Sequence, residues 1–581
     1  MGERKESREK TKYVICFVVL WILQMTAAFW FCTRKQGFHE DEFYTYYSTA
    51  RTNGFYVEDG AWMERDAYRD EFVVRPEERF RYGLVKQVQS WDVHPPMYYW
   101  VFHTVASLTP DVFSKWTGLS VNLFFHGINL ILLTYLSRLT AGRDKYLPLL
   151  VTFLYGFSPA AMSGVVFIRM YEMLTTFVLL CAVLHVRAVQ RLQGSLWQRG
   201  SRISFGTLFA MAAVTYVGFL TQYYYFIFLF FLAVSFCVWL LWRDRGIGNC
   251  LRYGVFQGFA FVLAYLTYPA FPGQMFKGQR GAQATENFFH LSNTFERLRF
   301  FWDLMNRYVF GGLLGLILLF LAAAAFAGCM GKLSKRRRAH AQAAENAGSR
   351  QRGERPGSGR APFYMLLFTV SGYFLAVSKT ALLLGDTSNR YQLPVYGIAA
   401  LLLLLGASFL PGLLSGAGEA SGDGGPFSAF AVGNGKRMAC VAAFFCVAVV
   451  GMSYVRADVV FLYPESGEAV AFARERAAAQ TPAVYIYKPG EEWCIWAVAD
   501  ELMEYDRVYF VSAAGGEPVT EPAIAEADAV VVYLPLYDDA EEEAAQRMRV
   551  LSGNGKLSEG YLQFSHKYCT EWYYCGDGGV R

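Results

Sequence analysis

Long apolar runs constrain this chain more than any other feature. Runs of about twenty apolar residues recur from Tyr13 to Val460, and each is long enough to cross about 30 Å of hydrocarbon as a helix. Only 18% of the residues are charged, whereas soluble proteins average about 25%. We therefore expect a mainly α-helical, multispanning membrane protein. The composition excludes a disordered chain, a collagen and a secreted disulfide scaffold.

Placing one helix on each run predicts about eleven membrane spans. They are expected near residues 13–32, 113–137, 146–164, 168–187, 204–221, 223–242, 253–270, 308–330, 362–384, 392–411 and 438–460. Because Lys and Arg collect in cytoplasmic loops, the charged connections place the N-terminus in the cytoplasm. The loop 33–112 and the C-terminal tail then face outward. The loops 332–360 and 411–437 are rich in Gly, Ala and Ser and are expected to be flexible linkers.

The tail has a different character from the rest of the chain. We expect a membrane domain over residues 1–462 and an acidic domain over 463–581 outside the cytoplasm. Three short β-rich runs, 484–487, 508–511 and 530–533, alternate with Ala-rich amphipathic stretches. This pattern predicts a small α/β structure with a mostly parallel sheet. The tail has no phosphate-binding glycine motif, so we assign it no nucleotide and prefer a cap or binding module without catalysis.

The outer loop also has helical patterns. Apolar residues recur at helical spacing over 80–91, as in a helix lying in the membrane interface. The double proline Pro95-Pro96 fits a helix start. Residues 97–106 are therefore expected to form a second, half-buried helix before the next span.

The first cluster with chemical potential is the run His39-Glu40-Asp41-Glu42, directly after the first span. Acidic residues at a membrane edge are commonly a solvated loop. The functional alternative is that one carboxylate acts as a general base on an acceptor hydroxyl. Its neighbour would then tune or orient it.

The second cluster is Asp92-Val93-His94, which precedes the rigid Pro95-Pro96 pair. The rigid pair fixes the direction of the Asp92 and His94 side chains. The structural alternative is a helix cap, in which Asp92 accepts hydrogen bonds from free backbone amides.

The third cluster is cationic and aromatic. It comprises Arg169, Tyr171, Arg390 and Tyr391 at the outer ends of two spans and Lys379 in the outer third of the ninth span. Converging cations suit a lipid phosphate, and Arg suits it best because its planar fork binds pairs of oxygens. Snorkelling to headgroups is the alternative.

Other polar groups in the spans have simpler interpretations. Asn122, His126 and Asn129 share one helix face, and hydrogen bonding between helices explains them. Tyr223-Tyr224-Tyr225 is interpreted as an interfacial aromatic belt.

Four short motifs together resemble a known family. They are Asp41-Glu42 after the first span, Asp92-x-His94-Pro95-Pro96-x-Tyr98-Tyr99 in the first loop, Arg169-Met170-Tyr171 at the fourth span, and Arg390-Tyr391-x-x-Pro394 late in the membrane part. Over roughly residues 10–410 the chain resembles the GT-C membrane glycosyltransferases, specifically family 39, the group of the protein O-mannosyltransferases and aminoarabinose transferases.

The resemblance implies a function and roles for residues. Members of this family move a sugar, with inversion, from a polyprenyl-phosphate carrier to a hydroxyl on the outer face. It implies that 1–462 is the catalytic domain and that Asp41 is the base with Glu42 beside it. Asp92 and His94 would shape the substrate site. Arg169 and Arg390 would hold the carrier phosphate, and Tyr171 and Tyr391 are further candidates for substrate binding.

The metal requirement stays open in the sequence. Some relatives of this group use a divalent metal, but this chain has no DxD motif. His39, Glu40 and His94 are therefore only candidate ligands.

The tail departs from the β-rich insertion of the eukaryotic members, which favours a bacterial enzyme of the plasma membrane that uses undecaprenyl phosphate. The hydroxyl acceptor, whether protein, lipid or cell-wall glycan, is left open. The alternative from another class is a transporter or flippase of lipid-linked sugars. The sequence argues against it because it reveals neither internal repeats nor broken helices. A third reading is a receptor without catalysis, in which the Asp41 cluster would be dispensable.

Overall fold

The computed structural model describes residues 2–50, 56–142, 144–194, 202–244, 247–327, 360–414 and 435–576. The two expected linkers, 332–360 and 411–437, lie outside these residues except for residue 360 and for 411–414 and 435–437, which belong to helices. The chain divides into two compact units. The helical unit comprises Met1–Phe31, Asp92–Tyr98 and Asn122–Val460, and the α/β unit comprises Cys32–Trp91, Tyr99–Val121 and Phe461–Arg581.

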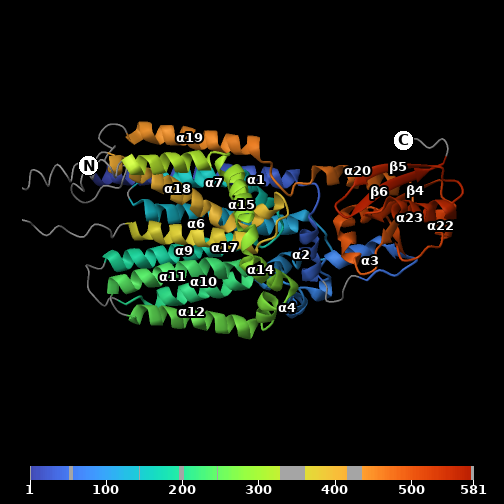
Figure 1. The fold of residues 1–581 in the computed structure, drawn as a ribbon, viewed down its shortest axis with the longest axis horizontal. Helices are drawn as coiled ribbons and strands as arrows, with labels where there is room; N and C mark the ends of the chain where they lie inside the picture. The colour runs from blue at the N-terminus through green and yellow to red at the C-terminus, as the bar shows by residue number, and fades with distance from the viewer. Residues whose placement is uncertain are drawn as a thin grey trace, which may run out of the picture. The chain divides into compact units, whose positions relative to one another are not determined.

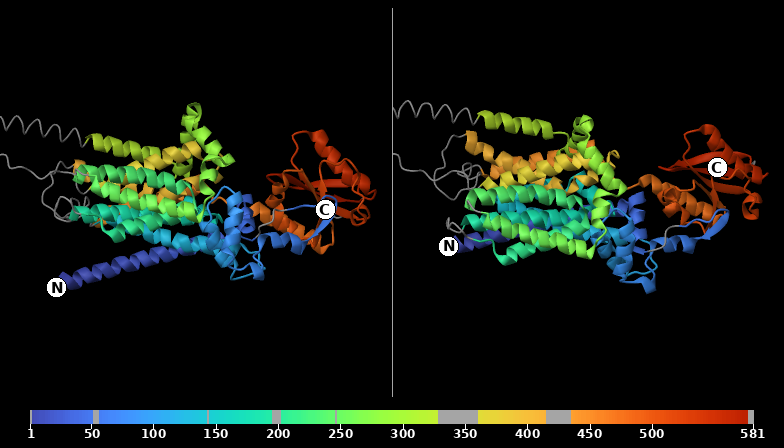
Figure 2. Two further views of the ribbon diagram at one scale, coloured as in Figure 1. Left: turned by 90° about the horizontal axis from the view of Figure 1, so that it is seen from below. Right: turned by 60° about the horizontal axis from the view of Figure 1, so that its bottom comes forward.

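Long helices with their axes side by side make up the helical unit (Figures 1 and 2). The helices on the apolar segments are α1 (Gly2–Arg34), α6 (Lys115–Ala141), α7 (Leu147–Gly156), α8 (Pro159–Val166), α9 (Tyr171–Gly194), α10 (Phe205–Thr221), α11 (Tyr224–Asp244), α12 (Gly248–Thr267), α15 (Thr294–Phe310), α17 (Ala361–Thr380), α18 (Leu393–Leu414) and α19 (Gly435–Arg456). The elements between them are α13 (Phe271–Phe276), α14 (Gln279–Phe289), η3 (Leu291–Asn293) and η5 (Thr387–Tyr391).

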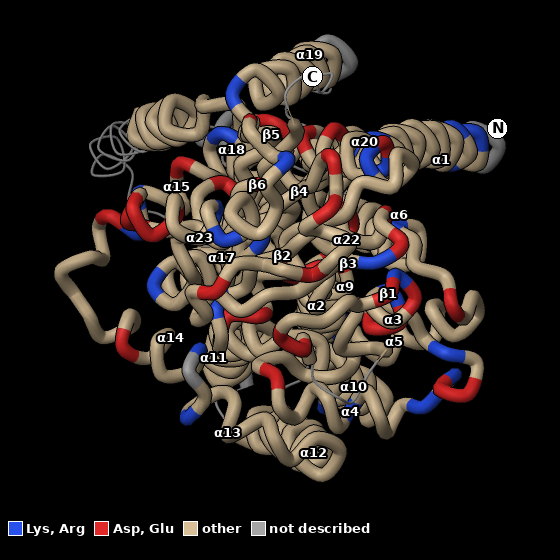
Figure 3. Tube along the Cα trace, turned by 90° about the vertical axis from the view of Figure 1, so that its right-hand side faces the viewer, with Lys and Arg blue, Asp and Glu red and all other residues tan. Residues whose placement is uncertain are grey.

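The apolar lengths confirm a multi-pass membrane protein. Among the described residues, seven helices are long and apolar enough to cross a membrane, and up to ten spans result if each bent pair counts as one. With the shorter helix Phe205–Thr221, an apolar helix lies on each of the eleven expected segments. Apolar side chains such as Val255, Phe259 and Leu266 stay exposed along α12. Such a surface suits lipid, and Figure 3 shows α12 almost free of charge.

Three of the expected spans are bent rather than straight. The pair α7 and α8 bends by 58°, the pair Leu291–Phe310 and Leu314–Ala327 by 89°, and the pair Gly385–Tyr391 and Leu393–Phe409 by 75°. Pro159 explains the first bend, because it lacks a backbone N–H. The φ angles of 61° at Gly311 and 82° at Gly312 explain the second, because glycine enters the left-handed region at no steric cost. The expected span 308–330 therefore starts too early.

The α/β unit combines the outer-loop segments of the sequence with its tail. Its helices are α2 (Glu40–Ala50), α3 (Arg65–Arg69), α4 (Tyr82–Trp91), most of α5 (Met97–Ala106), α20 (Pro464–Ala478), η7 (Glu492–Val498), α21 (Ala499–Leu502), α22 (Pro522–Ala525) and α23 (Ala540–Gly553). Helices α4 and α5 confirm the two helical patterns of the outer loop.

One six-stranded sheet organises this unit, in the order β1-β3-β2-β4-β6-β5. The strands are β1 (Ala61–Glu64), β2 (Ala483–Tyr487), β3 (Arg507–Ser512), β4 (Ala529–Pro535), β5 (Glu559–Ser565) and β6 (Cys569–Cys575). Strands β2, β3 and β4 lie on the three predicted runs, and β2 is parallel to both of its neighbours. The other pairings are antiparallel, so the expectation of a mostly parallel sheet is wrong. Val484, Ile486 and Val532 are fully buried in its core.

Candidate active site

The acidic run after the first span forms the start of α2. The backbone N–H of His39 donates to Glu42 Oε2 at 2.6 Å, and the backbone N–H of Asp41 donates to His39 Nδ1 at 3.0 Å. These two bonds make a capping box in which His39 is the cap and Glu42 is the third helical residue. Carboxylates in the first turn also suit the positive end of the helix dipole. Glu42 and His39 therefore have a structural task that the sequence reading did not assign.

Glu42 is also half of a buried ion pair. Lys35 Nζ lies 2.9 Å from Glu42 Oε2, and both side chains are fully buried. Lys35 donates a further bond to the carbonyl of Phe461 at 2.7 Å. Burial lowers the pKa of the Lys35 ammonium, and Glu42 only partly restores it. Removing one partner of such a pair costs about 3–5 kcal/mol of stability.

Asp41 differs from Glu42 in exposure. Its side chain is 31% exposed, and its Oδ2 lies 3.7 Å from His39 Nδ1. A carboxylate that keeps contact with solvent and stands on a capped helix is both accessible and held in place. Of the two candidate catalytic carboxylates, Asp41 thus has the surroundings that suit a general base.

The candidate metal ligands of this segment are engaged with other groups. His39 Nδ1 accepts the Asp41 amide and lies 3.3 Å from Glu40 Oε2. Glu40 accepts a hydrogen bond from the Tyr568 hydroxyl at 3.1 Å and pairs with Lys567. A metal ion held by His39 and Glu40 would have to displace these contacts.

In the helical unit, the second and third clusters of the sequence meet. Asp92 Oδ2 lies 3.1 Å from His94 Nδ1, and Arg169 Nη2 lies 3.4 Å from His94 Nε2 and 3.5 Å from His94 Nδ1. Burial raises the pKa of the Asp92 carboxyl, but His94 and Arg169 outweigh burial and hold that pKa below its usual range. The three side chains form a chain of carboxylate, imidazole and guanidinium.

A residue that the sequence reading missed secures this segment. Gln274 of α13 donates through Nε2 to the carbonyl of Asp92 at 2.6 Å and to the Tyr268 hydroxyl at 2.9 Å, and it accepts from the Tyr223 hydroxyl at 2.5 Å. Both the nitrogen and the oxygen of the Gln274 side-chain amide are therefore hydrogen-bonded. Tyr223 has a specific bond beyond its expected place in an aromatic belt. A single Gln in a loop carries no sequence signal for such a role.

Arg169 stands at the break between α8 and α9. Asn122 Nδ2 donates to the carbonyls of Val165 at 3.0 Å and Phe167 at 2.5 Å, which satisfies backbone groups that the end of α8 leaves open. Asn129 Nδ2 donates to Glu172 Oε2 at 2.7 Å in the first turn of α9. Hydrogen bonding between helices is confirmed for the two asparagines, and it holds the segment that carries Arg169. It is not confirmed for His126, whose ring nitrogens have no hydrogen-bond partner among the described residues, although its Nδ1 lies 3.4 Å from Glu172 Oε2.

Arg390 belongs to the same contact network. Its guanidinium lies 5.3 Å from the ring centre of Phe167, two residues before Arg169, and 5.1 Å from that of Tyr391. The rings of Tyr171 and Tyr391 meet edge to face at 6.1 Å. Arg169 is 4% exposed and Arg390 is 3% exposed. Two of the three predicted cations are thus buried in the same part of the helical unit, and Arg390 packs on the ring of Phe167 close to Arg169 in the chain.

Lys379, at the end of α17, has different neighbours. Its Nζ donates to the carbonyl of His290 at 2.6 Å, to Asn293 Oδ1 at 2.8 Å and to Thr294 Oγ1 at 2.9 Å. An ammonium group has three hydrogens, and three neutral oxygens receive them. A phosphate oxygen would have to replace one of these acceptors, so phosphate binding by Lys379 stays a prediction. Arg169 and Arg390 are the better candidates for binding a phosphate.

These contacts predict what the loss of Lys379 does. Lys379→Met should loosen the turn 290–294, because three hydrogen bonds to the buried ammonium disappear, each worth about 1.5–3 kcal/mol when the donor is charged. We expect a lower unfolding temperature and faster protease cleavage near Asn293, with Lys277→Met, an exposed lysine of the same region, as the control. A Lys379→Met protein with unchanged stability and a weaker grip on a lipid phosphate would restore the phosphate role.

No family model and no curated protein matches the chain. Among solved structures it is similar to ArnT from Cupriavidus metallidurans bound to undecaprenyl phosphate, at 11% identity and a TM-score of 0.46, over 97% of this chain and 98% of that one. It is also similar to the oligosaccharyltransferase AglB from Archaeoglobus fulgidus in complex with an inhibitory peptide and a dolichol-phosphate, at 13% identity and a TM-score of 0.40, over 96% of this chain and 74% of that one. TM-scores below 0.5 assign neither a substrate nor a reaction to this chain. Any proposed reaction must therefore rest on the chain's own residues.

Proposed function

We propose that the chain is an inverting glycosyltransferase that moves a sugar from a polyprenyl-phosphate carrier to a hydroxyl acceptor at the outer face of the membrane. The observation that carries the proposal is the pair of buried arginines in the helical unit, Arg169 and Arg390. Arg390 lies over the rings of Phe167 and Tyr391, and the ring of Tyr391 meets that of Tyr171. Phe167 and Tyr171 are each two residues from Arg169 in the chain. Guanidinium groups bind phosphate oxygens in pairs, which suits a carrier phosphate. In this proposal Tyr171 and Tyr391 line the same site.

The proposed reaction is a single displacement. Asp41 accepts the proton of the acceptor hydroxyl while its oxygen attacks the anomeric carbon of the sugar. The new carbon–oxygen bond forms as the bond to the carrier phosphate breaks, so the configuration inverts. Polyprenyl phosphate leaves with the electron pair, and Arg169 and Arg390 hold its charge. General base catalysis and charge stabilisation of this kind are each worth several orders of magnitude in rate.

His94 and Asp92 have a positioning role in this proposal. Asp92 Oδ2 lies 3.1 Å from His94 Nδ1 and so holds the imidazole ring, whose two nitrogens lie 3.5 and 3.4 Å from Arg169 Nη2. The held ring in turn limits the directions in which the Arg169 guanidinium can point. This fixes the anion-binding fork before the carrier arrives.

The test is turnover of a defined lipid-linked sugar. Cells that lack the gene should accumulate one polyprenyl-phosphate sugar, which mass spectrometry of the lipid extract identifies. The purified protein in lipid should then release polyprenyl phosphate from that compound when an acceptor is present. A donor that accumulates but is never cleaved by the pure protein contradicts the proposal.

A second candidate, a flippase or transporter of lipid-linked sugars, is favoured by the three bent helix pairs. The sequence did not reveal them, and broken helices are common in transporters. Vesicles with the reconstituted protein separate the two functions. Movement of a labelled lipid-linked sugar between leaflets, with its sugar–phosphate bond intact, supports the second candidate.

Sidedness gives a further prediction. The proposed chemistry needs the C-terminal domain outside and the Arg336-Arg337-Arg338 loop in the cytoplasm. Alkaline phosphatase fused after Arg581 should therefore be active, while an insertion near Gly348 should be silent. The reverse pattern would overturn both the span count and the placement of the chemistry.

Gln274 gives a test of the positioning role. Gln274→Leu removes the bonds to the Asp92 carbonyl and two tyrosines, so the Asp92–His94 segment should shift. Because small misplacements are costly in catalysis, we expect turnover to fall by about tenfold to a hundredfold at saturating donor, with little loss of folded protein. Gln283→Leu, on the exposed side of α14, should leave turnover unchanged. Equal turnover in the two variants contradicts the role.

A further inference from the structure

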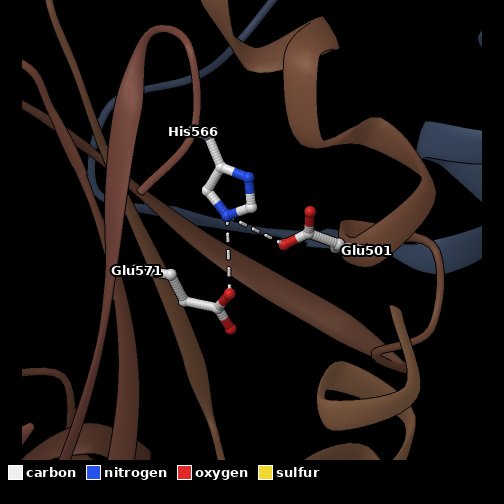
Figure 4. Close-up of side chains that lie close together, drawn as sticks. All are labelled: Glu501, His566 and Glu571. Atoms are coloured by element: carbon white, nitrogen blue, oxygen red, sulfur yellow. Dashed lines mark ion pairs between the residues drawn. The ribbon is translucent and has the colours of Figure 1, made fainter. Parts of the chain in front are cut away.

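Three side chains outside the candidate active site converge on one point in the α/β unit (Figure 4). Glu501 comes from α21, His566 from the turn between β5 and β6, and Glu571 from β6. His566 Nε2 lies 3.4 Å from Glu501 Oε2 and 3.5 Å from Glu571 Oε2. The three atoms all lie within 4.8 Å of one another.

The converging atoms are buried without hydrogen bonds. Within the described part of the chain, His566 Nε2, Glu501 Oε2 and Glu571 Oε2 have no hydrogen-bond partner. The side chains of Glu501, Glu571 and His566 are 1%, 0% and 13% exposed. Leaving a buried carboxylate oxygen unsatisfied is costly, so the arrangement calls for a partner between the three atoms.

The other oxygen of Glu571 shows that the carboxylate is held in this direction. Its Oε1 accepts a hydrogen bond from the buried hydroxyl of Tyr533 at 3.2 Å. Tyr533 lies on β4 and Glu571 on β6, and the two residues face each other in the sheet register. The direction of Oε2 toward His566 is therefore set by the sheet and not by a mobile side chain.

The distances from His566 fit a tetrahedral metal ion. Zn²⁺ binds His nitrogen and carboxylate oxygen at about 2.0–2.2 Å, and tetrahedral angles then separate neighbouring ligand atoms by about 3.4 Å. His566 Nε2 lies 3.4 and 3.5 Å from the two carboxylate oxygens, and the two oxygens lie within 4.8 Å of each other. An octahedral Mg²⁺ with bonds of about 2.1 Å would bring neighbouring ligands to about 3.0 Å and prefers oxygen to imidazole.

We propose that Glu501, His566 and Glu571 bind one divalent transition-metal ion of the zinc type. With three protein ligands, the fourth tetrahedral position is left to water. The ion would link α21, which lies between β2 and β3 in the chain, to the β5–β6 hairpin, which forms one edge of the sheet. Metal binding would thus stabilise the fold of the α/β unit, independently of the proposed transfer reaction.

The experiment measures metal content and stability of the full-length protein in detergent or lipid. The protein is stripped with a chelator and dialysed against Zn²⁺, and the bound metal is counted by mass spectrometry. We expect one Zn²⁺ per chain and an unfolding temperature that rises by several degrees on reloading. Mg²⁺ alone should give neither result.

Variants locate the site. Glu571→Gln and His566→Asn should each bind less than a tenth as much Zn²⁺ at the same free concentration, and Glu526→Gln, an exposed carboxylate of the same unit, should bind as wild type. If Glu571→Gln does not fold, the proposal is still tested by comparing the zinc content and unfolding temperature of stripped and reloaded wild-type protein. The proposal is overturned if wild type does not bind stoichiometric Zn²⁺ and if the stripped and reloaded proteins unfold at the same temperature. The three side chains then share a proton instead of a metal ion. Full binding in both variants also overturns it.

Discussion

Asp41→Asn should abolish most sugar transfer while leaving the protein folded and inserted. The amide keeps the shape of the carboxylate and its backbone N–H still donates to His39, but it cannot accept a proton from the acceptor hydroxyl. Loss of a general base costs about 10² to 10⁴ in rate. Release of polyprenyl phosphate from the purified variant in lipid measures the effect at saturating donor.

The neighbouring carboxylate separates chemistry from folding. Glu42→Gln breaks the buried pair with Lys35 and weakens the capping box, so we expect a loss of stability of about 3–5 kcal/mol with the remaining folded enzyme still active. Asp66→Asn, at a side chain that is 79% exposed, should change neither quantity. Near-normal turnover by Asp41→Asn would return the acidic run to a purely structural role.

Arg390→Met should weaken binding of the lipid donor. A charge-assisted contact contributes about 1.5–3 kcal/mol, which corresponds to roughly tenfold to over a hundredfold in affinity. The methionine keeps an apolar stem among Phe167 and Tyr391, so insertion should be preserved. Titration of the purified protein in lipid with polyprenyl phosphate gives the dissociation constant.

The conservative variant tests the geometry of this contact. Arg390→Lys keeps the charge but lacks the planar fork, so it should restore only part of the affinity. Arg280→Met, at an exposed position of α14, serves as the matched control. Acceptor binding should be unchanged in all three proteins. Equal donor affinity in Arg390→Met and wild type would contradict the phosphate-binding role and leave Arg390 as a packing residue.

The helices could be predicted because hydrophobic length is a local property of the sequence. Each of the eleven apolar runs contains a helix, and the three β-rich runs of the tail are strands. The bends were not predicted, and the expectation of unbroken helices is wrong. Pro159 and the pair Gly311-Gly312 mark two of them in the sequence, but the angles depend on packing between helices.

The candidate site shows where sequence reasoning ends. The acidic run was recognised, but its use as a capping box was not, because His39 stands where Ser or Thr is usual. The meeting of His94 with Arg169, the bonds of Gln274 and the three acceptors of Lys379 all join residues far apart in the chain. Such contacts arise from tertiary packing, and no spacing in the sequence encodes them.

Strand β1 has a consequence for how the protein is made. It pairs with β3, so a strand of the first loop completes a sheet whose other strands are synthesised last. While the membrane spans between β1 and β3 are being inserted, Ala61–Glu64 has no partner strand. A product that stops before Arg507 would retain the helices of the membrane spans and still expose this unpaired edge, which invites proteolysis or aggregation. The β1–β3 pair can therefore form only after translation has passed Ser512, and until then the edge of β1 is exposed.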